Sequence, residues 1–360
     1  MATYDIQRYL LMTTDPVHIG TGGYRLGRVD NSIVREPGTR IPKIPGSSLH
    51  GAARSYAARL YENIAAAGKD HRNVAHPGTD PVCYTFGYVK EDAGPVGEAD
   101  KKSEAYSGVV NVCDAHVALF PVHSMCGPVW VSTVERMKES GFKISDVPGT
   151  MDTGDALFSW SREVPINIGW IMVGAGGKVG VDAPPKWKGE RWEAVRERIV
   201  LINEPLFSHI VNSNLEVRTS VSIDPMRGAA EDGALFTYEA LPRSTFLYMD
   251  AIMDDYRDSF PGGNRLEEWL KRAMPEDEPV TLSGDGVHLE EQGWKGDGPK
   301  KTFQKYERLG LTWSEPGDVL KAGLQMIEWL GVGGMGTRGF GRISIVGEPL
   351  KKSYPEEEWQ

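Results

Sequence analysis

The sequence predicts an α+β fold in which helices cover one face of a mostly antiparallel sheet. Three observations lead to this prediction. Several short stretches alternate apolar and polar residues, which is typical of strands. Two longer stretches carry apolar residues at helical spacing behind a serine that can cap a helix. Two further alternating stretches flank a short turn and indicate a long hairpin.

The first part of the chain is expected to hold two strands and a helix. Residues 4–13 and 109–120 alternate and are the predicted strands. Between them, Ser47 or Ser48 is expected to cap a helix that ends near Glu62, because apolar side chains then share one face.

The remainder is expected to hold the hairpin, further strands and two helices. Ser132 begins a capping box for a short helix, and Ser314 caps a longer helix that ends at Gly331. We expect residues 141–195 to be irregular. The expected hairpin arms and strands are residues 215–223, 235–239, 244–253 and 340–346.

Composition and charge limit the classes of function. The chain has 360 residues, 40 % of them hydrophobic and 25 % charged, which describes an ordinary globular protein. Its net charge of −10 excludes a simple polycation that coats nucleic acid. The charge is uneven, however, at +4 over residues 1–60 and −7 over residues 250–300. This distribution indicates a polyanion bound on one side, and a functionless variation of surface charge is the alternative.

Cysteine content and hydropathy predict the compartment. Three cysteines cannot form a disulfide framework, and no apolar run reaches the roughly 18 residues that span a bilayer. The N-terminus has no signal-peptide pattern. We therefore expect a cytoplasmic protein without a membrane partner.

The glycine-rich stretch at residues 331–339 matches the dinucleotide fingerprint GxGxxG in two registers. That fingerprint requires a strand before it and a helix after it, whereas a helix precedes and a strand follows here, so a nucleotide site is disfavoured. Exposed glycine amides and Arg338 would instead let a phosphodiester lie against the backbone. A helix end with a turn is the alternative, and it explains Gly331 alone.

A second glycine-rich stretch, residues 18–35, leads to the first predicted helix. Ser47, Ser48 and the free amides at the start of that helix could bind an anion, and Arg54 on the same helix could reach a neighbouring phosphate. Ordinary capping by the serines is the alternative.

A four-ligand zinc spacing occurs at Cys113, His116, His123 and Cys126. The first two lie three apart in a predicted strand, which places their side chains on opposite faces. A buried cysteine and surface histidines are therefore favoured over zinc.

Two segments resemble the RAMP superfamily, the RNA-binding subunits of CRISPR effector complexes. They are residues 16–54 (PVHIGTGG…GRVDNSIVREP…PKIPGSSLHGAAR) and 332–343 (VGGMGTRGFGRI). Residues 118–127 and 221–242 are similar to the repeated backbone subunit of type III-B (Cmr) complexes. The related type III-A (Csm) backbone subunit is the second choice.

The resemblance implies one RAMP domain over residues 1–360. It consists of an RRM-like (ferredoxin-like) palm, helical finger insertions and a protruding hairpin thumb at about residues 222–236. The insertions would lie at about 63–106, 141–200 and 250–310, and they exceed what we expect of the superfamily.

The resemblance also implies partners and an activity. Copies of the chain would stack along crRNA with other type III subunits, bind complementary target RNA, and cleave it at regular intervals as a metal-dependent endoribonuclease. Asp30 would be the catalytic residue, either as ligand of a divalent ion (Mg²⁺ or Mn²⁺) or as general base. An Asx turn is the alternative for Asp30.

The remaining residues implied by the resemblance would contact RNA, with Met226 as an apolar wedge and His18 as a possible proton carrier or structural group. The superfamily usually has lysine at the position of His50, so that phosphate contact is expected to be weaker or pH-dependent. The predicted RNA-binding set is His18, Ser47, Ser48, His50, Arg54, Arg218, Met226 and Arg338.

Two other functions remain open at this point. One is a structural filament subunit that binds RNA without cleaving it, and the other is a separate nucleotide-binding enzyme.

Overall fold

The structure is a computed structural model, and its residues fall into two compact units. Unit 1 contains residues 1–4, 50–111 and 253–326, and unit 2 contains residues 5–49, 112–252 and 327–360. The described residues are 4–22, 29–68, 74, 76–91, 103–262, 280–283, 286–289 and 313–353. Most of the insertion predicted at residues 250–310 therefore lies outside the described residues.

Unit 2 is built on one mixed sheet. Most of its strand pairs are antiparallel, whereas β11–β9 and β13–β7 are parallel. The strand order is β10 (Ile166–Ile168), β11 (Ile171–Lys178), β9 (Asp155–Phe158), β13 (Ile199–Leu201), β7 (Gly127–Ser132), β6 (Ala115–Ser124), β16 (Phe246–Met253), β1 (Asp5–Thr13) and β19 (Ile343–Ile345). Two short strands, β2 (Lys43–Ile44) and β20 (Leu350–Ser353), pair with β6 and β1.

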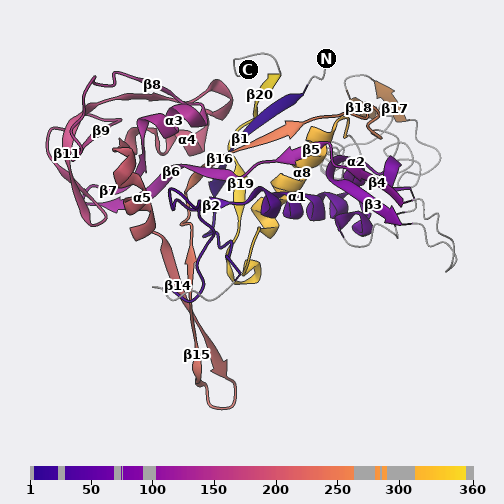
Figure 1. Cartoon of the computed structure of the whole chain (residues 1–360), viewed down its shortest axis with the longest axis horizontal. Coiled ribbons are helices and arrows are strands. Elements are labelled where there is room, and N and C mark those ends of the chain that lie inside the picture. The colour runs from indigo at the N-terminus through magenta and orange to yellow at the C-terminus, as the bar shows by residue number, and fades with distance from the viewer. Residues whose placement is uncertain are drawn as a thin grey trace. The chain divides into compact units, whose positions relative to one another are not determined.

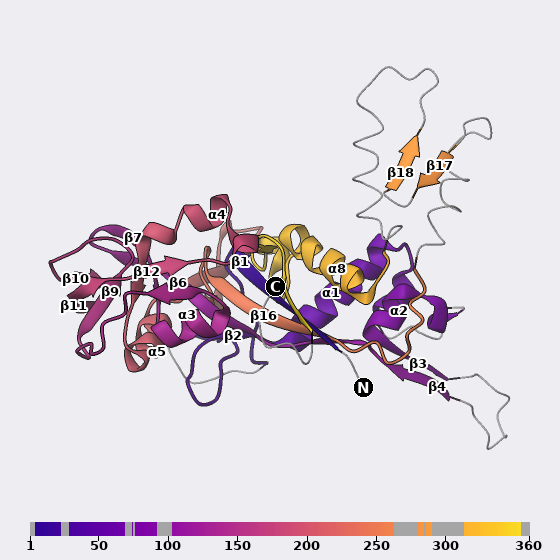
Figure 2. The same cartoon turned by 90° about the horizontal axis from the view of Figure 1, so that it is seen from above.

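Aromatic packing forms much of the core of unit 2. The ring of Phe142 lies 5.4 Å from that of Trp187 and 5.0 Å from that of Trp192, and both tryptophans are fully buried. The helices of this unit are α3 (Val134–Ser140), which lies along β6 (Figure 2), α4 (Glu190–Glu193) and α5 (Glu204–Ser213). The mixture of sheet and helices confirms the predicted α+β class.

A long hairpin projects from unit 2 (Figure 1). Its arms are β14 (Glu216–Asp224) and β15 (Ala229–Ala240), paired from Glu216 with Ala240 to Asp224 with Ala229. The predicted hairpin and its turn are confirmed; the second arm begins at Ala229, six residues nearer the turn than expected.

Unit 1 contains most of two long helices, α1 (Gly46–Leu60) and α8 (Pro316–Leu330). Gly323 of α8 lies against Ala53 of α1, where a Cβ on the glycine would come within 2.3 Å of the Ala53 carbonyl oxygen. The unit also contains α2 (Pro81–Phe86) followed by the β3–β4 hairpin (Gly87–Glu91 and Ser103–Ser107), seen in Figure 2, and the pair β17 (Val280–Ser283) and β18 (Gly286–Leu289).

Several sequence-based expectations were wrong. Residues 141–195 are not irregular, because they contain β9, β10, β11, α4 and the pair β8 (Lys143–Ser145) and β12 (Gly180–Asp182). The strand predicted at 109–120 is interrupted, so that β5 (Val110–Val112) ends before β6 begins.

The predicted helix starts also shift by one or two residues. Thr133, not Ser132, caps α3, because the Thr133 hydroxyl accepts from the Arg136 amide while the Ser132 hydroxyl donates to Ala118. The first helix begins at Gly46, which places both predicted cap serines inside its first turn. Across the described ranges, no helix is long and apolar enough to cross a membrane.

We predict that Gly323→Ala destabilises unit 1, because the added Cβ meets backbone and not a movable side chain. The free energy of unfolding should fall by about 1–3 kcal/mol, measured by urea denaturation followed by circular dichroism. Gly51→Ala is the matched control on α1, where a Cβ meets nothing within 4 Å. It should stabilise the helix by up to about 1 kcal/mol. A Gly323→Ala protein as stable as the wild type would contradict the close packing.

Candidate functional site

Three segments of unit 2 meet at the base of the hairpin. The loop before α1 contacts the end of β15, where Val17 bridges Leu241 and Asn31 lies beside Tyr238. The glycine-rich loop after α8 contacts the same loop, because the Gly334 amide donates to the His18 carbonyl at 3.0 Å. These contacts define the hairpin-base site.

Asp30 is held on β15 by a single residue, Thr237. The Thr237 amide and hydroxyl both donate to Asp30 Oδ2, at 2.8 and 2.7 Å. In return, the Asp30 amide donates to the Thr237 hydroxyl oxygen at 2.9 Å. Oδ2 is thus occupied, whereas Oδ1 has no donor among the described residues.

These hydrogen bonds keep Asp30 ionised. The Thr237 hydroxyl, followed by the Thr237 amide, lowers the pKa of Asp30 below its ordinary value because both donate to the charged form. The side chain is exposed to solvent. Asp30 therefore presents one carboxylate oxygen as an acceptor, base or metal ligand.

An ion pair to a buried carboxylate fixes the loop that carries Asp30. Arg35 Nη2 lies 2.6 Å from Glu239 Oε1, and Oε2 accepts from the Ile33 amide at 3.3 Å. The Glu239 amide donates to the Asn31 carbonyl at 3.0 Å. Glu239 is 8 % exposed, so its charge depends on these partners.

His18 lies inside the same contact region. Its side chain is buried, its Nδ1 donates to the Glu239 carbonyl at 2.7 Å, and its ring meets Tyr238 edge to face. A Cβ on Gly333 would come within 2.5 Å of the His18 carbonyl oxygen, so this approach requires glycine. His18 thus has the structural hydrogen bond considered as an alternative, and its contact with RNA stays a prediction.

Exposed arginines surround the hairpin base. Arg338, in the glycine-rich loop, is exposed, and its guanidinium has no partner among the described residues. Arg218 at the start of β14 contacts Glu216 at 2.6 Å and lies 4.8 Å over the Phe340 ring, with its side chain 43 % exposed. Arg243, which follows β15, is also exposed. Such guanidinium groups suit phosphate recognition.

Met226 is 93 % exposed at the tip of the hairpin. Asp224 stabilises the turn by accepting from the Met226 amide at 2.8 Å, and Gly228 supplies a positive φ of 63°. The tip therefore presents an apolar side chain to solvent, and its role as a wedge stays a prediction.

The start of α1 differs from the predicted anion site. Asp114 Oδ1 already accepts from the Gly46 amide at 2.8 Å, and the Ser48 amide donates to Pro45. Ser47 is exposed and Ser48 is half-buried. A phosphate at this helix start would have to compete with the Asp114 carboxylate.

Further along α1, Arg54 is used within unit 1. Its guanidinium donates to the carbonyls of Ala66 at 2.8 Å and Phe86 at 3.4 Å, and the residue is 9 % exposed. Burial lowers the pKa of Arg54. The pKa of His50 is also lowered, mainly by burial and to a lesser extent by the positive charge of Arg54. The His50 ring packs edge to face on Phe86. These contacts give Arg54 a structural role in place of the predicted phosphate contact.

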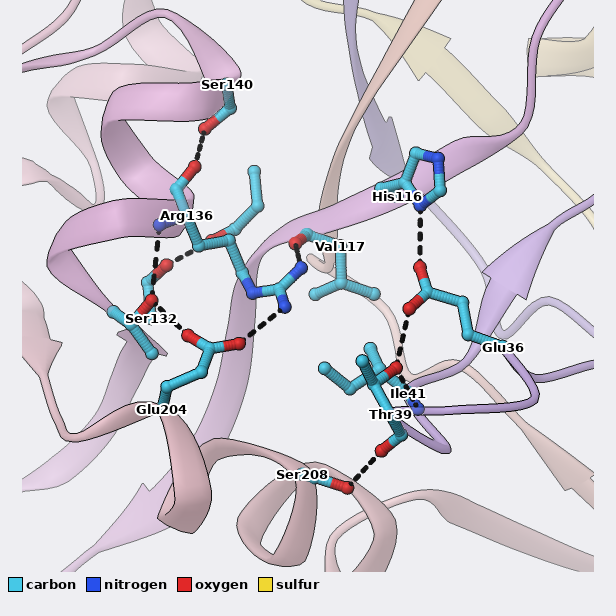
Figure 3. A network of polar contacts seen from close by, with 12 residues as sticks. Glu36, Thr39, Ile41, His116, Val117, Ser132, Arg136, Ser140, Glu204 and Ser208 are labelled. Carbon is cyan, nitrogen blue, oxygen red and sulfur yellow. Dashed lines mark hydrogen bonds and ion pairs between the residues drawn. The ribbon is translucent and has the colours of Figure 1, made fainter.

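A second polar network holds residues 36–39 of the loop before α1 (Figure 3). His116 Nδ1 lies 2.7 Å from Glu36 Oε1, and the Ser208 hydroxyl of α5 donates to the Thr39 carbonyl at 2.7 Å. His116 is therefore engaged, and no group of three or more His, Cys, Asp or Glu residues within the described part of the chain could hold a metal. The zinc spacing does not form a site there.

Sequence reasoning missed the residues that hold Asp30. Thr237 and Glu239 lie on β15, on the same side of the strand because they are two residues apart. The stretch FTYEA that contains them reads as an ordinary strand, so no local signal distinguishes them from other strand residues.

The arrangement around the glycine-rich loop agrees with the predicted order. Helix α8 precedes it and β19 follows it, the reverse of a dinucleotide-binding turn. The hairpin-base site thus combines an ionised carboxylate with exposed arginines on an α+β scaffold, a combination typical of proteins that bind or process a polyanion.

Comparison with known families agrees. The sequence model of the RAMP superfamily matches residues 10–344, so the chain belongs to this superfamily. The chain is 27 % identical over 255 residues to the CRISPR system Cmr endoribonuclease Cmr4 of Pyrococcus furiosus, covering 66 % of this chain and 78 % of that protein. The resemblance to the type III-B backbone subunit is thereby confirmed.

Two further proteins are similar. A Csm3 endoribonuclease of Methanothermobacter thermautotrophicus is 31 % identical over 83 residues, covering 22 % of this chain and 32 % of that protein. A chain of a type III-B Cmr-beta complex in its apo state superposes with a TM-score of 0.52 at 14 % identity, covering 94 % and 96 % of the two chains. This likeness shows a shared fold; the RRM-like palm and the thumb stay predictions.

We predict that Glu239→Ala strongly destabilises unit 2, because it leaves the half-buried Arg35 guanidinium without its carboxylate and the Ile33 amide without its acceptor. The free energy of unfolding should fall by about 3 kcal/mol. Glu216→Ala, which breaks the more exposed pair with Arg218 on the same hairpin, should cost less than about 1 kcal/mol. Urea denaturation of both variants tests this, and equal losses would contradict it.

We also predict an acid-sensitive contact between Asp15 and Arg342. The Arg342 guanidinium lowers the pKa of Asp15 below 3.8, so the ion pair stabilises the fold above that pH and is lost as pH falls through the lowered pKa. Asp15→Asn should reduce Tm by about 1–3 °C at neutral pH. The difference from wild type should stay constant from about pH 7 to pH 5 and shrink as the pH falls below 3.8 toward the lowered pKa, measured by a thermal series; a difference that does not shrink at acid pH would contradict the assignment.

Proposed function

We propose that this chain is the guide-RNA-binding backbone subunit of a type III CRISPR effector complex, of the type III-B class, and that it cleaves bound target RNA at regular intervals. Copies would stack along crRNA with other subunits of the complex. The observation that carries this proposal is Asp30, an ionised and exposed carboxylate seated at the base of a projecting hairpin in a RAMP-superfamily chain. The names of its relatives Cmr4 and Csm3 as endoribonucleases support it.

The positions of charged groups support RNA binding by this site. Arg218 lies at the base of the hairpin on β14, and Arg338 lies on the glycine-rich loop after α8. Arg338 has no partner among the described residues and is free to contact a phosphate. Met226 at the far end of the hairpin would enter the guide–target duplex and displace a nucleotide. The hairpin would thus act as the thumb.

A displaced nucleotide makes cleavage chemically accessible. Its 2′-oxygen attacks the adjacent phosphorus in line, the P–O5′ bond breaks, and the products are a 2′,3′-cyclic phosphate and a 5′-hydroxyl. The 2′-hydroxyl loses a proton and the departing 5′-oxygen gains one. Asp30 Oδ1, which has no donor among the described residues, is the group that would accept the proton or orient the attacking hydroxyl.

The side chains near Asp30 indicate how a divalent ion would be held. Asp30 is a single carboxylate, and the described residues offer no cluster of three metal-binding side chains. Mg²⁺ is commonly held by one or two carboxylates together with substrate phosphates. Asp30 therefore fits an ion shared with the RNA, where the ion would stabilise charge that develops on the phosphate.

We predict that Asp30→Asn in the assembled complex abolishes cleavage of matched target RNA. The amide keeps an oxygen for the Thr237 donors but removes the charge, so the cleavage rate should fall at least about a hundredfold. Binding of crRNA and target RNA should stay within about twofold. Asp152→Asn, an exposed aspartate elsewhere in unit 2, is the matched control and should cleave normally.

The same assay tests the metal and the structural alternative. EDTA should stop cleavage and added Mg²⁺ or Mn²⁺ should restore it, while RNA stays bound throughout. Unchanged cleavage by Asp30→Asn would favour a structural filament subunit whose cleavage partner lies elsewhere.

A further inference from the structure

The side chain of Asp30 depends on the hairpin for its orientation. Its hydrogen bonds to described residues all come from Thr237, through the amide at 2.8 Å and the hydroxyl at 2.7 Å. Both end on Oδ2, and no described residue donates to Oδ1. A carboxylate held by two donors to one oxygen has little freedom to rotate.

The backbone on either side of Asp30 is fixed separately. The Asn31 amide donates to the Thr237 carbonyl at 3.0 Å, and the Asn31 carbonyl accepts from the Glu239 amide at 3.0 Å. Val29, on the other side, is buried. The loop would therefore stay on β15 if the Thr237 hydroxyl were removed. That hydroxyl donates to the Asp30 carboxylate and accepts from the Asp30 amide.

We propose that Thr237 is the positioning residue for the Asp30 carboxylate, so that the hairpin which enters the RNA duplex also sets the geometry of cleavage. The inference rests on the proposed function of Asp30. The proposal assigns Thr237 a contact with Asp30 and none with the RNA. A shift of the hairpin base would move Thr237 and the carboxylate together, because the loop that carries Asp30 is itself bonded to Thr237 and Glu239. Cleavage would therefore respond to how the hairpin is seated on its duplex.

The hairpin offers a matched set of variants. Thr237→Val removes the hydroxyl but keeps the shape, the strand propensity and the Thr237 amide donor. Thr237→Ser keeps the hydroxyl. Thr219 is the cross-strand partner of Thr237 on β14, and its hydroxyl has no partner among the described residues, so Thr219→Val is the control for the substitution itself.

The test compares these variants in the assembled complex with guide and matched target RNA. Thr237→Val should lower the single-turnover cleavage rate about tenfold with target affinity unchanged, because one of two donors to the carboxylate is lost. Thr237→Ser and Thr219→Val should stay within about threefold of wild type. If Thr237→Val reduces RNA binding and complex assembly together with the cleavage rate, the hydroxyl has a purely structural role and the proposal is wrong.

A second readout uses the chain without RNA. In Thr237→Val, the Asp30 amide loses its acceptor and should exchange with solvent about tenfold faster, measured by residue-resolved hydrogen exchange. The Asn31 amide, which bonds to the Thr237 carbonyl, should be unchanged. Equal acceleration at both amides would indicate a displaced loop and would overturn the proposal.

Asp30→Asn in the same series separates the two hypotheses. If Asp30→Asn is inactive while Thr237→Val cleaves like wild type, the positioning role is wrong and the proposed function stands. If Asp30→Asn cleaves normally, both are wrong.

Discussion

The buried carboxylate of Glu239 is the group on which the geometry of the hairpin base depends. It must be paired because it is removed from water, and its partners Arg35 and the Ile33 amide both belong to the loop before α1. The loop therefore lies against β15 in one register. Thr237 is two residues earlier on the strand and faces the same side, so the register that satisfies Glu239 also brings Thr237 to Asp30.

The glycine-rich loop is fixed through the same loop. The Gly334 amide bonds to the His18 carbonyl, while His18 itself bonds to the Glu239 carbonyl. The absence of a side chain at Gly333 permits this approach. Arg338 is thereby carried to the hairpin base. A chain with a net charge of −10 can in this way present positive charge at one site, because position and not total charge determines the local field.

Local patterns predicted the long and strongly periodic elements well. Strand β1, the first hairpin arm β14 and α8 each repeat over enough residues for the period to be read. The region 141–195 was predicted poorly because its strands are short, and β11 (IMVGAGGK) carries glycines in place of alternating side chains. Within this region, β9 pairs with β11 and also with β13, which lies beyond residue 195, so β9 depends on a partner outside the local stretch.

Periodicity and turn residues in the sequence predicted the α+β class, the hairpin and both glycine-rich loops, and the resemblance to the RAMP superfamily added Asp30 as a candidate. Tertiary structure decided what each polar group contacts. It placed Asp30 on Thr237, 207 residues away, and enclosed the Arg54 guanidinium among carbonyls of unit 1. The physical reason is that periodicity depends on neighbours along the chain, whereas a buried or partly buried polar group takes its partner from whichever distant segment folding brings within hydrogen-bond distance.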